Sequence, residues 1–148
     1  MTSSKQITDA SAGIVPVRKV NKVYLFLMLR SYSFWDFPKG MIEEGELPLS
    51  AAIREAQEEA SLDPGLLRFN WGKDCHVTDP YRKHKDKIAI YFLAETDQTH
   101  IILPYSEEIG KPEHDEYRWM TYIEAKKLAN ERIGKVLDWA QRKIKGKR

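Results

Sequence analysis

The sequence predicts a mixed α/β fold of the α+β class, in which a mixed β-sheet lies between helices. Apolar, β-prone segments and amphipathic helical segments both occur, but they do not alternate as regular strand–helix–strand units. The chain has 148 residues, of which 42% are hydrophobic and 31% charged, a composition that suits one core. We find no internal repeat, so we expect a single domain over residues 11–146 after a loose segment, residues 1–10.

The chain is expected to begin with a β-hairpin. Residues 12–18 and 23–30 are apolar and β-prone, and Asn21-Lys22 between them is expected to form the turn. The second segment, VYLFLMLR, is so continuously apolar that it should be buried on both faces. Residues 31–40, which contain a proline and a glycine, are expected to form a loop.

The remaining elements follow from composition and from helix-breaking residues. A helix is expected over residues 49–60, because Pro48 is tolerated in a first turn and Asp63-Pro64-Gly65 ends the helix. Further strands are expected at 66–71, 87–95, 99–103 and 117–121, a polar loop at 106–116, and helices at 122–129 and 131–143.

Composition also limits the class of protein. A formal net charge of +2 gives no indication of a nucleic-acid or membrane partner. The single cysteine, Cys75, excludes an internal disulfide, which is usual in a reducing compartment. We see neither a signal peptide nor an apolar run of the roughly 18 residues that a membrane span needs. We therefore expect a cytoplasmic protein, and a monomer or weak dimer.

Three glutamates of the expected helix are spaced for cation binding. Glu55, Glu58 and Glu59 share one face of a helix, with Cβ atoms roughly 5–6 Å apart. Charges this close repel unless a cation lies between them, and Mg²⁺ prefers carboxylate oxygens. The plainer interpretation is a solvated acidic face, which many helices carry. Arg54 lies four residues before Glu58 and eight after Glu46, so it is expected to pair with one of these carboxylates.

The residues around these glutamates resemble the signature of the Nudix hydrolase family, G-x5-E-x7-R-E-U-x-E-E-x-G-U, where U is a bulky aliphatic residue. Ala56 departs from the pattern by its small size. Ser61 stands where glycine would suit a left-handed helix end, a substitution that costs ~1–2 kcal/mol. The positions that match the signature are Gly40, Glu46, Arg54, Glu55, Glu58, Glu59 and Leu62.

The resemblance implies a Nudix fold, with the signature as loop–helix–loop, and hydrolysis of a diphosphate linked to another moiety. It implies Mg²⁺, or Mn²⁺ in its place, which would neutralise phosphate oxygens and lower the pKa of the attacking water. A carboxylate then accepts the proton, and Glu58, Glu59 and a loop glutamate are the candidates. The residues so assigned are Glu55, Glu58 and Glu59 as metal ligands, Gly40 with Lys39 through a main-chain carbonyl, Glu55 and Glu58 as catalytic groups, and Glu46 and Arg54 as a structural pair.

Three stretches resemble one branch of that family, the asymmetrical diadenosine tetraphosphate hydrolases. They are FWDFPKG at 34–40, KIAIYFLA at 87–94 and EHDEYRW at 113–119. This resemblance implies cleavage of diadenosine tetraphosphate to ATP and AMP. It makes Glu113 a metal ligand or base, although Pro112 replaces the histidine that usually precedes this glutamate, and an insertion at 104–111 adjoins the site.

Such a substrate needs aromatic rings for its bases and cations for its phosphates. Each candidate also has a plainer interpretation, with Trp35 and Tyr91 in the core and Lys87 as an edge-strand charge. The segment 82–85 could likewise be an ordinary basic surface loop. The candidates are Trp35, Lys39, Tyr81, Lys83, His84, Lys87 and Tyr91, with Arg82 and Lys85 in the same basic segment.

Other functions remain open at this point. A nucleoside triphosphate, oxidised or not, is one alternative substrate, and a 5′-triphosphorylated RNA end is the only nucleic acid expected as a partner. An inositol pyrophosphate would call for a denser basic surface. A binding module that keeps the fold without catalysis is a further possibility, but the presence of both Glu58 and Glu59 argues against it.

Overall fold

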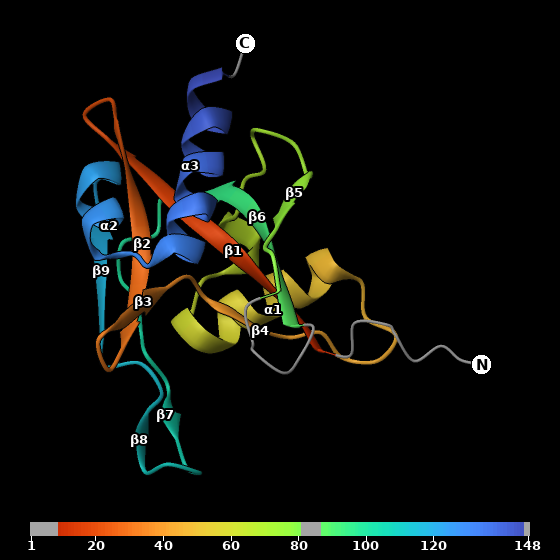
Figure 1. Ribbon diagram of the computed structural model, residues 1–148. Coiled ribbons are helices and arrows are strands. Elements are labelled where there is room, and N and C mark those ends of the chain that lie inside the picture. Colours follow the sequence, from red (N-terminus) through yellow and green to blue (C-terminus); the bar gives the residue numbers. More distant parts are fainter. Residues whose placement is uncertain (1–8, 81–86, 147–148) are drawn as a thin grey trace.

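The structure is a computed structural model that describes residues 9–80 and 87–146. Within them, seven strands form one mixed sheet and two more form a small hairpin (Figure 1). The sheet contains β1 (Asp9–Val20), β2 (Val23–Ser31), β3 (Phe34–Asp36), β4 (Lys39–Met41), β5 (Cys75–Val77), β6 (Lys87–Glu95) and β9 (Glu116–Met120). The hairpin contains β7 (Tyr105–Ser106) and β8 (Lys111–Pro112).

Strand β1 is the centre of the sheet. It runs parallel to β6 over Asp9–Val17 and antiparallel to β2 over Val17–Val20. Its first half also pairs with β4, so that Gly13 faces Lys39 across the ladder. A side chain at Gly13 would collide with the Pro38 carbonyl oxygen, so this glycine lets the segment before β4 approach the sheet.

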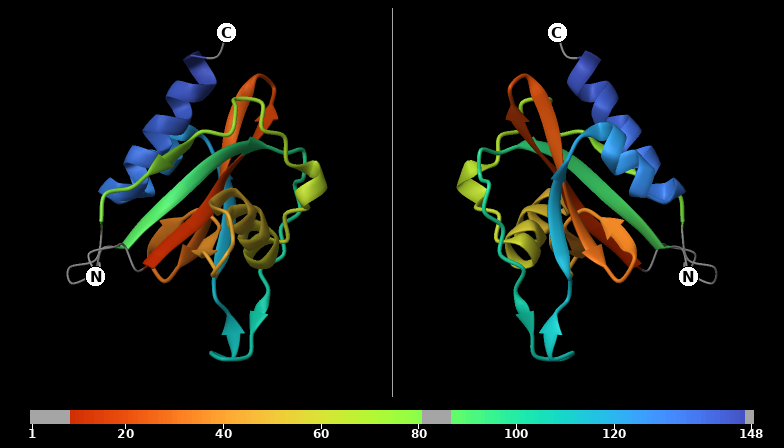
Figure 2. Two further views of the ribbon diagram at one scale, coloured as in Figure 1. Left: turned by 90° about the vertical axis from the view of Figure 1, so that its right-hand side faces the viewer. Right: turned by 90° about the vertical axis from the view of Figure 1, so that its left-hand side faces the viewer.

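Helices cover both faces of the sheet (Figure 2). Val15 and Val17 of β1 pack into a core with α2 and α3, whereas Ala12 and Ile14 pack into a second core with α1. This alternation is what a strand buried on both faces requires. The helices are α1 (Pro48–Ala60), α2 (Tyr122–Leu128) and α3 (Glu131–Gly146), with a 3₁₀ turn at Pro64–Leu66. The prediction of a mixed sheet between helices is therefore confirmed.

Most of the expected elements are present within a few residues of their expected bounds. The turn between β1 and β2 is at Asn21 and Lys22, which both have positive φ angles, the geometry that suits a two-residue hairpin. Strand β1 begins at Asp9, before the boundary expected at residue 11, and residues 1–8 lie outside the described part. No helix within the described ranges is both long and apolar enough to cross a lipid bilayer.

Four expectations for single elements were wrong. Residues 66–71 form no continuous strand: after the 3₁₀ turn, only Arg68 makes an isolated bridge, to Glu95. Residues 99–103 are irregular, and their apolar residue Ile101 is buried against the α1 core without strand pairing. The presumed loops contain β3, β4 and β8, and β5 was not expected. Residue propensities cannot identify strands this short, because pairing with neighbouring strands is what stabilises them.

Candidate active site

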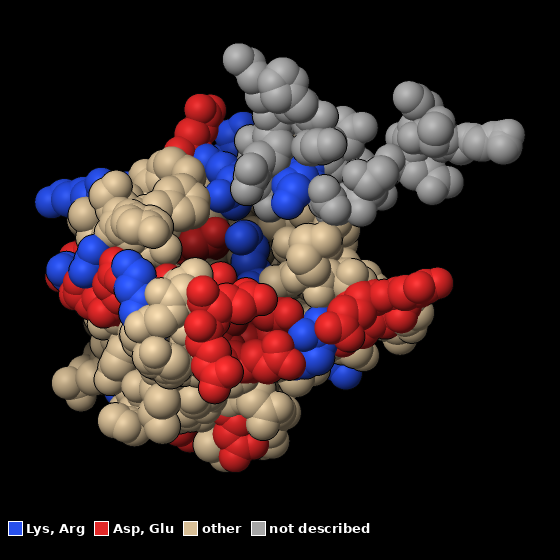
Figure 3. Space-filling view, turned by 90° about the horizontal axis from the view of Figure 1, so that it is seen from below, with Lys and Arg blue, Asp and Glu red and all other residues tan. Residues whose placement is uncertain are grey.

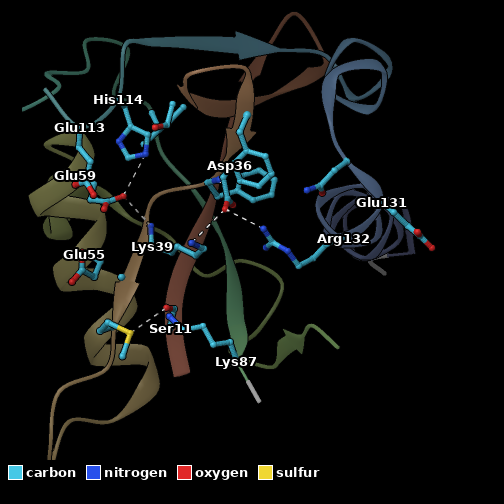
Figure 4. A pocket seen from close by; sticks show the side chains of 17 residues that line it. Ser11, Asp36, Lys39, Glu55, Glu59, Lys87, Glu113, His114, Glu131 and Arg132 are labelled. Atoms are coloured by element: carbon cyan, nitrogen blue, oxygen red, sulfur yellow. Dashed lines mark hydrogen bonds and ion pairs between the residues drawn. The ribbon is translucent and has the colours of Figure 1, made fainter. Parts of the chain in front are cut away.

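A pocket of about 950 Å³ opens beside β3 and β4, between α1 and the start of α3 (Figure 4). Acidic and basic side chains both line it, and two of the acidic ones, Asp36 and Glu131, lie beside the basic ones. We call Glu55, Glu59 and Glu113 the acidic wall, and Lys39, Lys87 and Arg132 the basic wall. Figure 3 shows acidic side chains gathered on this face of the molecule, next to a hollow that holds basic ones.

The acidic wall combines one helix and one loop. Glu55 and Glu59 lie one turn apart on α1, and Glu113 directly follows β8. Burial raises the pKa of Glu59 to about 8, although the Lys39 N–H donates to its Oε1 at 3.3 Å, and the nearby charges of Glu113 and Glu55 raise it further. Burial also raises the pKa of Glu55, and Arg54 opposes that rise. His114 Nε2 lies 4.0 Å from Glu59 Oε1. The wall therefore brings several carboxyl groups together where solvation is poor.

Gly40 is packed directly against the carboxylate of Glu55. A Cβ atom at position 40 would overlap the carboxylate carbon and both of its oxygens. The backbone of β4 can lie this close to the acidic wall only because residue 40 has no side chain. The glycine thus sets the distance between the β4 main chain and the helix carboxylates.

Arg54 fixes the loop before α1 to the helix. Its Nε donates to Glu46 Oε2 at 2.8 Å and one terminal nitrogen donates to Glu46 Oε1 at 2.9 Å, a bidentate pair. These hydrogen bonds lower the pKa of Glu46 to about 2. The other terminal nitrogen donates to Glu55 at 2.8 Å and to Glu58 at 3.2 Å. The pair predicted between Glu46 and Arg54 is thus present, and Arg54 also orients Glu55.

Asp36 holds part of the basic wall in place. This buried carboxylate accepts the Tyr91 hydroxyl at 2.9 Å and the Phe37 N–H at 2.6 Å through Oδ1. Its Oδ2 pairs with Lys39 at 3.5 Å and with Arg132 at 3.9 Å. Two cations from distant parts of the chain are therefore directed to one point beside the pocket (Figure 4).

The NUDIX domain profile matches residues 8–140 of this chain. The chain belongs to the Nudix family. Asymmetrical bis(5′-nucleosyl)-tetraphosphatases of Sus scrofa and Caenorhabditis elegans are 34% identical to it over 119 and 124 residues. These matches cover 74% and 81% of this chain and 72% and 84% of the relatives. The suspected resemblance to this branch is thereby confirmed.

Other matches agree with the Nudix fold. The solved structure of a C. elegans Ap4A hydrolase binary complex superposes with a TM-score of 0.81 at 27% identity, covering 94% of this chain and 99% of that one. An RNA pyrophosphohydrolase of Francisella tularensis subsp. mediasiatica (strain FSC147) is 30% identical over 125 residues, which cover 76% of this chain and 77% of the relative.

Ser61, at the last glycine of the Nudix signature, has the left-handed conformation that the glycine would have, with φ 60° and ψ 29°. Its N–H donates to the Gln57 carbonyl, the bond of an αL-type helix end, and the Leu62 N–H donates to the Ala56 carbonyl. The Ser61 hydroxyl also donates to the Ile102 carbonyl at 3.0 Å. That hydrogen bond, which glycine could not make, offsets part of the strain.

The third Nudix glutamate, Glu58, is not part of the acidic wall. Its side chain is 58% exposed and faces a smaller hollow beside the pocket. Within the described ranges, no three acidic, histidine or cysteine side chains converge closely enough to hold an ion as they stand. The chemistry of the wall nevertheless fits a hard divalent cation, because Glu55 and Glu59 present carboxylate oxygens whose pKa is raised chiefly by burial and further by neighbouring carboxylates.

Two of the aromatic residues predicted to stack on bases, Trp35 and Tyr91, are buried. Tyr91 is 0% exposed, and Trp35 is 5% exposed beneath the guanidinium of Arg118 at 5.0 Å. As placed, both rings belong to the core, which corrects the expectation that they contact substrate. Lys39 and Lys87 do line the pocket. The other candidates, Tyr81, Lys83 and His84 with Arg82 and Lys85, lie outside the described residues.

Sequence reasoning missed Arg132, Asp36 and Phe34. Arg132 carries the clearest overlooked signal, because a cation in the first turn of a helix opposes the helix dipole and needs a carboxylate partner. Asp36 could have been recognised from its position three residues before Lys39. Phe34 is 39% exposed and lines the pocket, whereas the neighbouring Trp35 is buried. In a short strand this alternation decides which ring contacts the pocket.

Proposed function

We propose that this protein is a Mg²⁺-dependent pyrophosphohydrolase that cleaves dinucleoside tetraphosphates, such as diadenosine tetraphosphate, to a nucleoside triphosphate and a nucleoside monophosphate. The observation that carries the proposal is the acidic wall facing the basic wall across one pocket. A cation bound at the acidic wall would neutralise its negative charge, and phosphates bound at the basic wall would neutralise its positive charge. The relatives that bear the tetraphosphatase name support this choice of substrate.

The basic wall binds the polyphosphate chain. Lys39 and Arg132 share the counter-charge of Asp36, so they are oriented before the substrate arrives, which lowers the entropy cost of binding. Lys87, at the first residue of β6, adds a cation near the mouth of the pocket. Asp36 also accepts a hydrogen bond from the buried Tyr91 hydroxyl, through its other carboxylate oxygen.

The acidic wall would hold the cation. Glu55, Glu59 and Glu113 line the pocket, Glu58 lies beside them, and the main chain at Gly40 adjoins Glu55. When bound, Mg²⁺ neutralises phosphate oxygens and lowers the pKa of the attacking water; Mn²⁺ could replace it.

The reaction adds a water oxygen to phosphorus and breaks the bond from that phosphorus to a bridging oxygen. One carboxylate accepts the proton of the water. Glu58 and Glu113 are the candidates for this role, because both are more exposed than Glu55 and Glu59 and can receive the proton from solvent-accessible water.

The direct test is hydrolysis of diadenosine tetraphosphate with Mg²⁺, followed by product separation. We expect ATP and AMP in equal amounts. Glu58→Gln and Glu113→Gln separate the two candidate bases: the variant that removes the base loses at least about 100-fold in kcat while Mg²⁺ still binds. Absence of turnover with any nucleotide, even with Mn²⁺, would reject the enzyme and favour a binding module.

Removal of pyrophosphate from a 5′-triphosphorylated RNA is the second candidate function. The Francisella RNA pyrophosphohydrolase, 30% identical over 125 residues, is the observation in its favour. A short 5′-triphosphorylated RNA distinguishes the two, because a kcat/KM above that for diadenosine tetraphosphate would reverse the order of the candidates. Nucleoside triphosphates belong in the same panel, as smaller substrates with the same phosphate chemistry.

A further inference from the structure

Two accessible aromatic rings line the two hollows that share the acidic wall. Phe34 lines the main pocket, and Tyr105, which is 65% exposed, lines the smaller hollow of about 260 Å³. The two hollows share part of their lining, namely Glu55, Glu59, Glu113 and His114. A substrate held at the acidic wall can therefore extend into both.

The two hollows differ in charge. The main pocket contains the whole basic wall, whereas no lysine or arginine is among the described residues that line the smaller hollow. The smaller hollow adds Glu58 to the shared carboxylates, and its remaining residues are Pro104, Tyr105 and Ser106. Several phosphates are therefore favoured in the main pocket, where lysine and arginine side chains can pair with them, whereas the smaller hollow offers no such side chain among its described residues and suits an uncharged nucleoside.

The hairpin that carries Tyr105 also leads into the acidic wall. Tyr105 pairs with Pro112 and Ser106 with Lys111, so the tyrosine lies on a paired strand and not at the tip of the loop. Glu113 follows Pro112 directly. The hairpin projects from the body of the molecule next to α1, as both views of Figure 2 show. One short element thus positions an aromatic ring and a carboxylate on the same side of the site.

We propose that the smaller hollow binds the nucleoside of the product that keeps one phosphate, with its base stacked on Tyr105. This inference rests on the proposed function. It explains why the substrate would be cleaved asymmetrically. The part of the substrate that carries three phosphates stays with the cations of the basic wall, and the smaller hollow receives the end that keeps one phosphate. Stacking on an aromatic ring tolerates different bases, so the hollow accepts nucleosides with different bases.

The test compares two substrates that differ in one nucleoside. Diadenosine tetraphosphate has a second nucleoside, and adenosine 5′-tetraphosphate lacks it. For Tyr105→Ala we expect KM to rise about tenfold for the first and to stay within about twofold of wild type for the second. If adenosine 5′-tetraphosphate is not cleaved, its Ki as a competitive inhibitor replaces KM. Tyr105→Phe should restore the wild-type KM, because it keeps the ring.

Ile109→Ala provides the matched control, since Ile109 is exposed on the same hairpin and lines neither hollow. An unchanged KM for Tyr105→Ala, or an equal loss with both substrates, would overturn the subsite while the proposed function stands. Wild-type protein that cleaves no dinucleoside tetraphosphate would reject the proposed function, and the subsite with it.

Discussion

The carboxylate of Asp36 lies 3.9 Å from the guanidinium of Arg132, and the same Oδ2 lies 3.5 Å from the Lys39 ammonium. Asp36 is buried, so removal of its charge leaves two cations beside each other in a poorly solvated place. We expect Asp36→Asn to lower the free energy of unfolding by about 1–3 kcal/mol and to raise KM about tenfold. Urea unfolding and steady-state kinetics measure the two effects.

Asparagine keeps an oxygen that can accept from Tyr91 and the Phe37 N–H, so the variant tests charge more than hydrogen bonding. Tyr91→Phe is the matched variant, because it removes the hydroxyl and leaves both cations paired. We expect it to change stability but to affect KM by less than about twofold. Equal KM values for Asp36→Asn and wild type would show that the carboxylate does not position the basic wall.

A methyl group at position 40 has no space, since it would occupy the position of the Glu55 carboxylate. Gly40→Ala should therefore displace Glu55 and lower kcat/KM by about 100-fold, as displacements of about 1 Å at an active site often do. Gly65→Ala is the control, because its new Cβ would meet only Asp63 Oδ1, at 3.4 Å. Circular dichroism checks that both variants fold. Full activity in Gly40→Ala would contradict the role of this close approach.

Glu59 is buried with two other carboxylates near it, which destabilises the protein in the absence of metal. We expect Glu59→Gln to raise the Tm measured in EDTA and to remove the increase in Tm that Mg²⁺ gives the wild-type protein. Thermal unfolding with and without Mg²⁺ measures both. A Glu59→Gln protein that Mg²⁺ still stabilises as strongly as wild type would exclude Glu59 as a ligand.

The low pKa of Glu46, in the loop before α1, predicts how the contribution of this residue to stability changes with pH. The ordinary value is 4.5 and the folded value is about 2, so the unfolded chain binds the proton first as the pH falls. The contribution of Glu46 to stability is thus complete above about pH 5 and is lost as the pH falls through about 2. The difference in unfolding free energy between wild type and Glu46→Gln should shrink from pH 6 to pH 3. Glu44→Gln, at an exposed position in the same loop, should show no such pH-dependent difference.

Regular patterns allowed the architecture to be predicted. The continuous apolar character of β2, the two-residue turn before it and the amphipathic α1 each depend on neighbours in the sequence, and these expectations are confirmed. The short strands β3, β4 and β5 exist because β1, β2 and β6 provide hydrogen-bonding partners. Such pairing is a property of the sheet and has no local signal.

The residues of the site fall into the same two groups: some could be predicted from local sequence patterns, and others depend on the tertiary fold. Glu55 and Glu59 were recognisable because helix spacing places them together, and Arg54 because its spacing from Glu46 allows a pair. Trp35 and Tyr91 were assigned to the substrate on the basis of residue type, but burial depends on which face of a strand packs into the core. Arg132 comes near Lys39 only through the tertiary fold, so no local pattern could reveal that proximity.

The parallel pairing of β1 with β6 has a consequence for folding during synthesis. Strand β1 is complete at Val20, yet its parallel partner β6 is complete only at Glu95. Until then one edge of β1, which includes Ile14 and Val15, has no neighbouring strand with which to form backbone hydrogen bonds. Contacts between segments so far apart form slowly, so the nascent chain carries an apolar edge during much of its synthesis. Variants that slow elongation before Glu95 should therefore aggregate more readily than variants that slow it afterwards.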